Sequence, residues 1–480
     1  MKILLVRPSP PKYTIGLKHI MVCEPLELEY VAAGVRGHEV EIYDMILERD
    51  LPGKIHSFKP DIVGTSSYIT GVKKVKAICT EAKKFNTEIL TIVGGVHATL
   101  VPQDFIDPHI DVIAMGEGTN LIGQIIEQYD QGKTLATIPG LAFPQGERLR
   151  RTPPGSLEVD TAHLPLPRRS LVEKHRHRYY YLFHQPVALM KTIFGCPFSC
   201  NFCFCWPLTG GKLYMREAES VVDELEQIET REVYFVDDTF FVDVNRLRRL
   251  RDLISARKID KNYLAYAHSN FIVEHPHIMR DWADIGLKAC IIGLESPHDD
   301  ELQNYEKKAT VEQNTEAIEI LRKNRVDVYG SFIVDPAWSR EDFARLEDYI
   351  ERTGLYYLVI QPLTPLPGTR IFSAYEDKLS VARDAFEVWD MQHAVLPTSL
   401  PQKEFYRLIR RIYIRKILNV RRARHMQLRT VPPIWSKKYL RLLLGGIRVM
   451  SSLRQAHLHP HILTPGQGEK HAAFTPGQAI

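Results

Sequence analysis

The sequence lacks the features that mark membrane-embedded, exported or disulfide-stabilised proteins. No apolar run reaches the ~20 residues that a bilayer-spanning helix requires. The opening residues 1–7 are too short and too soon charged for a signal peptide. Cysteine is scarce, and Cys23, Cys79 and Cys290 stand alone in apolar or mixed surroundings, which predicts buried thiols in a reducing compartment. We therefore expect a cytoplasmic protein that is at most peripheral to a membrane.

The other four of the seven cysteines lie within ten residues, as Cys196, Cys200, Cys203 and Cys205. Three thiolates at the C-x3-C-x2-C spacing can hold three corners of an iron–sulfur cube and leave the fourth iron open to another ligand. Cys205 is too close to Cys203 to reach a further corner. A structural zinc site is the alternative, but no second Cys/His pair follows at zinc-finger spacing. The pattern favours a [4Fe-4S] cluster held by Cys196, Cys200 and Cys203.

Residues 1–140 alternate strand and helix signals, which predicts a doubly wound, Rossmann-like α/β sheet. Strand signals occur at residues 2–7, 38–44, 61–66, 88–95 and 111–116, and helix signals at 27–35 and 72–85. The last three strands end in small or hydroxylated residues, and ligands of such sheets bind beyond the carboxyl ends of the strands. No G-x-G-x-x-G motif opens the first helix, which argues against a dinucleotide site. A receiver-like or nucleotide-binding sheet is the alternative.

The chain changes character after residue 140. Residues 141–185 are rich in proline and basic side chains, which predicts a linker. In residues 186–385, six strand signals recur, one for each expected strand–helix unit, at 187–193, 232–238, 263–268, 289–296, 327–335 and 356–361. The cysteine loop follows the first of them directly. This order predicts a partial (β/α)6, TIM-like barrel whose chemistry lies at the carboxyl ends of the strands.

The C-terminal region is strongly basic. Residues 386–455 form the expected helical region, in which the span 403–454 holds fifteen Lys and Arg against the single Glu404. Apolar residues interleave with these cations, so the segment can lie on an anionic bilayer. A solvated helical face or a nucleic-acid patch is the alternative, but no nucleic-acid motif accompanies it and we expect no nucleic-acid partner. Residues 456–480 are His-, Pro- and Gly-rich, which predicts a disordered tail.

The cysteine motif, with Phe202 before its last cysteine, resembles the signature of radical S-adenosylmethionine (SAM) enzymes, in which SAM binds the open iron. The strand ends of residues 1–140 resemble the cobalamin-binding domain that precedes the barrel in one subfamily of these enzymes. The Asp-x-His-x-x-Gly loop of methionine-synthase-type cobalamin domains is absent. The resemblance therefore implies a cobalt lower face without a histidine from that loop, with Tyr68 and His97 as the first candidates to shield it.

This resemblance implies two further sets of contacts. Those expected for SAM are Phe202, Asp237, Asp238, Gly293, Glu295 and Ser331. Those expected for cobalamin are Ser66, Tyr68, Gly94, Gly95, Val96, His97, Gly116, Glu117 and Gly118.

Residues 390–398, Glu404 to Tyr406 and 335–338 resemble hopanoid C-3 methylases. The resemblance implies cobalamin-dependent radical methylation of an unactivated carbon in a hydrophobic, lipid or terpenoid-like small molecule. An electron donor such as flavodoxin or ferredoxin is then expected as a partner. One alternative is the oxidative ring closure of a magnesium-porphyrin ester. A cobalamin or redox sensor, which would cleave no SAM, is an alternative of another class.

Overall fold

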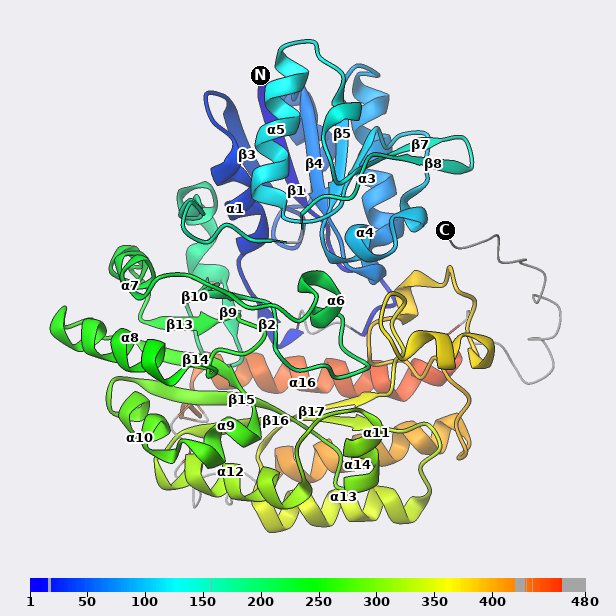
Figure 1. Cartoon of the computed structure of the whole chain (residues 1–480). Coiled ribbons are helices and arrows are strands. Elements are labelled where there is room, and N and C mark those ends of the chain that lie inside the picture. Colours follow the sequence, from blue (N-terminus) through cyan, green and yellow to red (C-terminus); the bar gives the residue numbers. More distant parts are fainter. Residues whose placement is uncertain (16–18, 157, 419–427, 429, 434, 460–480) are drawn as a thin grey trace.

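The computed structural model describes the chain except residues 16–18, 157, 419–427, 429, 434 and 460–480. Most of the predicted tail 456–480 and part of the basic segment 403–454 therefore lie outside the described residues. Two α/β units lie one above the other, and two long C-terminal helices run along the lower one (Figure 1). The predicted order of a Rossmann-like unit, a partial barrel and a helical C-terminal region is confirmed.

The N-terminal unit is a seven-stranded sheet. Its strands, in order across the sheet, are β3 (Glu39–Asp44), β1 (Lys2–Arg7), β4 (Ile62–Ser66), β5 (Leu90–Gly94), β6 (Val112–Ala114), β7 (Leu141–Gln145) and β8 (Arg148–Arg151). From β3 to β6 all neighbours are parallel. Alternate residues of β1 point to opposite faces, so Ile3 and Leu5 pack on one core and Leu4 and Val6 on the other. The first core includes α1 (Leu26–Gly34) and α5 (Gly118–Asp130), and the second includes α2 (Leu51–Phe58) and α3 (Val72–Phe85).

The beginning of the predicted linker 141–185 belongs to this sheet. β7 pairs antiparallel with β6, where Leu141 lies opposite Ala114, and β8 pairs antiparallel with β7. Leu141 and Ala142 are buried, whereas the rest of the hairpin is largely exposed. Because only these two residues of the hairpin are buried, its basic composition hides its strand signal. The connection between the two units begins after β8.

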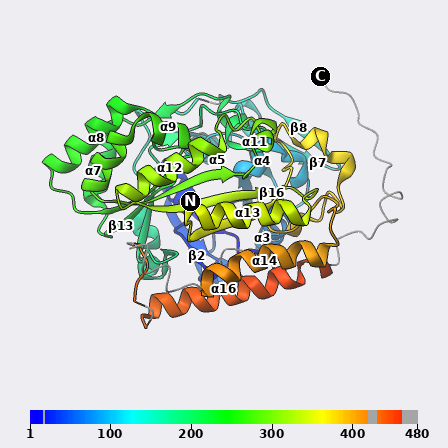
Figure 2. The ribbon, with the colours of Figure 1, turned by 90° about the horizontal axis from the view of Figure 1, so that it is seen from below.

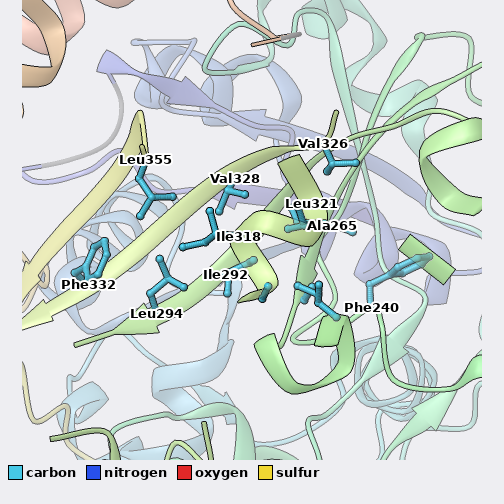
Figure 3. Packing of buried hydrophobic residues seen from close by; sticks show 14 of the residues in the cluster. Phe240, Ala265, Ile292, Leu294, Ile318, Leu321, Val326, Val328, Phe332 and Leu355 are labelled. Atoms are coloured by element: carbon cyan, nitrogen blue, oxygen red, sulfur yellow. The ribbon is translucent and has the colours of Figure 1, made fainter. Parts of the chain in front are cut away.

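The second unit is a six-stranded parallel sheet curved into a partial barrel. Its strands, in order, are β10 (Val187–Met190), β13 (Glu232–Phe235), β14 (Asn262–Ala267), β15 (Leu287–Glu295), β16 (Asp327–Val334) and β17 (Tyr357–Pro362). The outer helices are α7 (Ala218–Gln227), α8 (Val244–Ala256), α9 (Ser269–Glu274), α10 (Pro276–Asp284), α11 (Asp299–Asn304), α12 (Val311–Lys323) and α13 (Arg340–Thr353). The space between these strands and helices holds a hydrophobic core, here called the outer core. In it, Ile292 and Leu294 of β15 meet Ile318 and Leu321 of α12 (Figure 3).

The inner face of the barrel is aromatic. Because strand residues alternate in direction, Val233 and Phe235 of β13 face the helices while Tyr234 faces the interior. Tyr266, Tyr329 and Tyr357 occupy inner positions on β14, β16 and β17. Such rings fill a barrel interior with rigid apolar surface.

The C-terminal helices α14 (Gln402–Leu418) and α16 (Lys437–Gln455) lie side by side along the barrel (Figure 2). Phe405, Ile409 and Ile412 of α14 are buried in the outer core. Arg411 and Arg415 both pair with Glu347 of α13. The described part of segment 403–454 is therefore packed into the fold, with part of its charge paired. Within the described residues, every helix is too short or too polar to cross a membrane.

Candidate functional site

The cysteine loop begins where two short strands, β11 (Ile193–Phe194) and β12 (Tyr214–Met215), pair above β10. Gly195 has φ +95°, and a side chain there would strike the carbonyl of Lys212, so glycine is required. Residues far along the chain then fix the loop. Asn201 N donates to the carbonyl of Tyr305 (3.2 Å), and Asn201 O accepts from Ile371 N (3.0 Å). Arg370 donates to the carbonyl of Ser199.

All seven cysteines are free thiols. Burial raises the pKa of Cys196 to about 12 and also raises that of Cys200. A hydrogen bond from Cys205 lowers the pKa of Cys203, whose Sγ also accepts from Cys205 N at 3.4 Å. Cys205 therefore stabilises the thiolate form of Cys203. Within the described residues, no three His, Cys, Asp or Glu side chains converge as ligands of a single ion do. A cubane has its irons at separate corners, so three cysteines need only border a common space.

Asp237 and Asp238, both predicted to contact SAM, point in different directions. Asp237 is fully buried and accepts from Thr192 N (2.6 Å), Thr192 Oγ1 (2.7 Å) and Ile193 N (2.9 Å). It anchors the chain entering the cysteine loop. Asp238 lies 3.3 Å from Lys191 Nζ and accepts from Cys205 Sγ at 3.3 Å. The side chains of Lys191 and Asp238 are 18% and 26% exposed, so this pair can reach a ligand.

A buried ion pair stands beside the cluster loop. Glu295, at the end of β15 with φ +59°, accepts from Lys307 Nζ at 2.9 Å. Although burial opposes the charge, Glu295 and Cys200 raise the pKa of Lys307. A side chain at Gly293 would strike both partners, and Ser331 of β16 lies opposite Gly293 in the sheet. Lys307 was missed from sequence because it follows a helix rather than a strand.

Phe202 and His268 each contact other residues of the protein. The ring of Phe202 lies 5.7 Å from that of Tyr305, next to the loop anchor. His268 stacks on Phe198 at 3.9 Å and its Nε2 lies 3.1 Å from the carbonyl of Lys307. Burial, with the nearby charge of Lys307, lowers the pKa of His268 to about 3. His268 is therefore a neutral, hydrogen-bonded barrel histidine.

The predicted cobalamin residues gather at the carboxyl edge of the N-terminal sheet. Ser66 ends β4, Gly94 ends β5, and Gly116 follows β6, on three adjacent strands. Val96 and His97 begin α4 (Val96–Leu100), and Glu117 and Gly118 begin α5. Gly95 has φ +97°, and an added Cβ would lie 2.9 Å from Ser67 N. The edge therefore presents backbone and small side chains, as a bulky ligand requires.

His97 is engaged within this unit, whereas Tyr68 is not. His97 Nε2 lies 2.7 Å from Asp104 Oδ2, and the histidine is buried. Asp104 also accepts from Arg383 at 3.0 Å. Tyr68 instead approaches the cysteine loop, its ring 6.3 Å from that of Phe204.

The two units meet where α4 contacts α6 (Cys205–Thr209), next to the cysteine loop. Glu27 and Tyr68 belong to the upper unit there, and Cys205 and Asp238 belong to the lower one. Burial raises the pKa of Glu27 and of Tyr68, and Cys205 and Asp238 contribute to the shift at Tyr68. Tyr68 is nevertheless 63% exposed, and Glu27 is exposed as well. The small-residue edge and the cysteine loop therefore face each other, as a large planar cofactor held between the two units requires.

Two family models match the chain. The B12 binding domain matches residues 15–126, which form most of the N-terminal sheet. The Radical SAM superfamily matches residues 190–350, from the cysteine loop to α13.

Three curated proteins are similar in sequence. Hopanoid C-3 methylase of Methylococcus capsulatus is 30% identical over 415 residues, which cover 85% of this chain and 78% of that protein. An uncharacterized methyltransferase of Pyrococcus horikoshii is 27% identical, covering 78% of this chain and 82% of that protein. Anaerobic magnesium-protoporphyrin IX monomethyl ester cyclase of Rubrivivax gelatinosus is 26% identical, covering 58% and 52%.

Two solved structures share the fold. The radical SAM methyltransferase TsrM from Kitasatospora setae, bound to tryptophan and a SAM analogue, has a TM-score of 0.65 and 18% identity, covering 79% of this chain and 77% of that chain. OxsB, bound to aqua-cobalamin and SAM, has a TM-score of 0.68 and 14% identity, covering 95% and 72%. The chain belongs to the cobalamin-dependent radical SAM enzymes, the family of hopanoid C-3 methylase, and its cofactors are cobalamin, SAM and a [4Fe-4S] cluster.

Proposed function

We propose that the chain is a C-methyltransferase that places a methyl group on an unactivated carbon of a hydrophobic, lipid or terpenoid-like substrate. The observation that carries this proposal is the inner wall of the barrel below the cysteine loop. Its middle layers consist of Leu189, Tyr234, Leu264, Tyr266, Ile291, Tyr329 and Tyr357. Burying apolar substrate against such a wall is worth about 25 cal/mol per Å2. A strongly polar substrate would lose its hydration without compensation.

The cofactors divide between the two units. Cobalamin supplies the methyl group when bound, and the cluster with SAM supplies the species that abstracts hydrogen. Cys196, Cys200 and Cys203 hold the cluster. Asp238 and the Glu295–Lys307 pair, the latter beside Gly293 and Ser331, offer charges to the amino and carboxylate groups of SAM. Tyr68 stands on the cobalamin side, with its ring 6.3 Å from that of Phe204.

The reducing electron comes from a small electron-transfer protein, such as flavodoxin or ferredoxin, in the cytoplasm. This assignment is supported by the chemistry of the cluster, which must be reduced before SAM is cleaved.

Contact with an anionic membrane is proposed for one face of α16. Leu440, Leu444 and Ile447 follow helical spacing and are 54%, 49% and 57% exposed. Lys437 and Arg448 are exposed on the same helix. An apolar stripe with flanking cations suits the interface of an anionic bilayer. Three cations of segment 403–454, Arg411, Arg415 and Lys416, pair with α13, so the proposed surface is narrower than the sequence predicts.

Sedimentation with vesicles tests the membrane contact. The Leu444→Glu/Ile447→Glu double variant should lose binding to vesicles of phosphatidylglycerol while keeping SAM cleavage. Arg407→Glu, an exposed cation on α14, is the matched control and should bind as before. Equal binding by the double variant would reject the α16 surface.

Comparison of lipids from a deletion strain and its parent tests the proposed function. Loss of one methylated lipid, restored by the wild-type gene and not by the Cys203→Ala gene, is the expected result. Accumulation of an unclosed porphyrin ester would assign the cyclase reaction instead. Restoration by Cys203→Ala would assign a role without SAM cleavage, as for a sensor.

A further inference from the structure

A cavity of about 180 Å3 lies at the edge of the barrel, away from the cysteine loop. It is enclosed by β17, by α14 and α16, and by Ile20 and Phe183. Its walls are mostly apolar or aromatic, with Leu358, Val359, Leu442, Val449 and Met450 among them. Pockets for whole drug-sized ligands usually measure ~300 Å3 or more. This cavity therefore suits one end of a longer molecule.

The cavity lies at the seam where the barrel is open. β17 and β10 are the two edge strands of the six-stranded sheet. α16 spans the gap between them, because Lys438 Nζ donates to the carbonyl of Gln185 (3.0 Å) and the ring of Tyr439 stacks on Phe183 at 6.2 Å. Tyr357 packs in the aromatic interior of the barrel, whereas Leu358 packs against the outer core. Both residues line the cavity. The cavity therefore reaches around the edge strand to the inner face.

An aromatic path leads from the cavity toward the cysteine loop. Ring centroids are 4.3 Å apart for Tyr357 and Tyr329, and 6.2 Å for Tyr329 and Tyr181. They are 4.8 Å apart for Tyr181 and Tyr234, and 6.0 Å for Tyr234 and Tyr266. Tyr266 lies one residue before the end of β14, so these rings lead from the cavity to the carboxyl ends of the strands, where the cysteine loop lies.

Two polar groups of the cavity wall are already bonded to the protein. Lys416 Nζ donates to Glu351 Oε1 at 2.8 Å. Tyr413 OH accepts from Ile360 N at 2.7 Å. A polar ligand would have to break these bonds, whereas a hydrocarbon chain would leave them intact.

We propose that this seam cavity binds the aliphatic end of the substrate, an acyl or isoprenoid chain that lies along the tyrosine wall with its reacting carbon toward the cysteine loop. The seam between β17 and α16 is then the entry for the chain. The identity of the occupant as substrate rests on the proposed function, but the binding of a hydrocarbon chain does not.

Binding of dansylated undecanoic acid to the reconstituted enzyme tests the site. Val449→Trp fills the cavity and should weaken probe binding at least about tenfold, the equivalent of ~1.4 kcal/mol. Ser451→Trp, at an exposed position of the same helix, should bind like the wild type. Leu442→Ala enlarges the cavity and should shift the preference among competing fatty acids toward longer chains. If Val449→Trp folds poorly, Leu442→Ala still tests the cavity.

The readouts separate this inference from the proposed function. If neither cavity variant changes probe affinity or chain-length preference, the seam cavity is not the binding site, whatever the enzyme methylates. Probe binding that responds to both variants, together with no methylated lipid from any extract, would support a chain-binding seam and reject the proposed function. Substrate-free SAM cleavage equal to wild type shows that the variants keep the cofactor site.

Discussion

The two ends of the barrel use their charged residues differently. At the carboxyl ends of the strands, Lys191 and Asp238 pair while staying partly exposed. At the amino ends, His184 Nδ1 lies 2.5 Å from Glu232, and its Nε2 lies 3.1 Å from Tyr329 OH. The chain returns from the C-terminal region to complete this lower network through Thr430.

Thr430 closes the lower end. Its amide donates to Asp327 Oδ2 at 2.9 Å, and its hydroxyl donates to the same oxygen at 2.5 Å. That hydroxyl also meets the hydroxyls of Tyr329 (3.2 Å) and Tyr357 (2.6 Å). The lower end is therefore a stabilising closure, while the upper end keeps charges available for ligands. Barrel enzymes in general divide chemistry and stability in this way.

The largest effect is expected at the upper end from Cys203→Ala. The variant should lose the absorption of the reconstituted cluster and reduce SAM cleavage below detection, because only two cluster ligands remain. Cys205→Ala is the matched control and should keep both. Equal loss in the two variants would show that Cys205 is also a ligand.

Removing one partner of the buried upper pair should destabilise the fold. Glu295→Gln leaves Lys307 charged and unpaired, at a cost of about 3 kcal/mol in the free energy of unfolding. Chemical denaturation measures the change. Asp348→Asn, which breaks an exposed pair with Arg352, should cost less than about 1 kcal/mol. If Glu295→Gln lowers the free energy of unfolding no more than Asp348→Asn does, the buried pair stabilises the fold no more than an exposed pair.

At the lower end, Thr430→Val should cost about 2 kcal/mol, because the carboxylate of Asp327 loses a hydrogen bond within the protein. The folded fraction should cleave SAM at the wild-type rate. Thr137→Val, at an exposed position, should leave the denaturation midpoint unchanged. Slower SAM cleavage by fully folded Thr430→Val would contradict the separation of the two ends.

An effect of similar size depends on pH. With its pKa lowered to about 3 by burial and by Lys307, His268 stays neutral in the folded protein. The unfolded chain binds this proton below its usual pKa of about 6.5, so stability falls as pH decreases from about 6.5 toward 3. Between pH 7 and 5 the loss is about 2 kcal/mol. His268→Gln should remove this part of the pH dependence, and the exposed His163→Gln should not. Identical slopes would reject a neutral His268.

Local sequence patterns predict the sheets and the cluster loop well. The six barrel strands follow from short, nearly continuous apolar runs, as expected of buried parallel strands, and the cysteine spacing carries the cluster assignment. The division between Asp237 and Asp238 was available as well, since Asp238 shares a face with Tyr234 while Asp237 shares one with Phe235. Tertiary contacts could not be predicted from local sequence patterns. Arg370 and Thr430 act on partners far away in sequence, Lys307 reaches back to Glu295 from a turn after a helix, and the basic segment hides core residues such as Phe405 among its cations.

One measurement tests the central claim most directly. Reconstituted enzyme is incubated with a reductant, SAM bearing a trideuterated methyl group, and lipid extract from the deletion strain. The account predicts one lipid that gains a trideuterated methyl group, with 5′-deoxyadenosine and S-adenosylhomocysteine formed alongside it. SAM cleavage without label in any lipid, or label confined to polar metabolites, would contradict it.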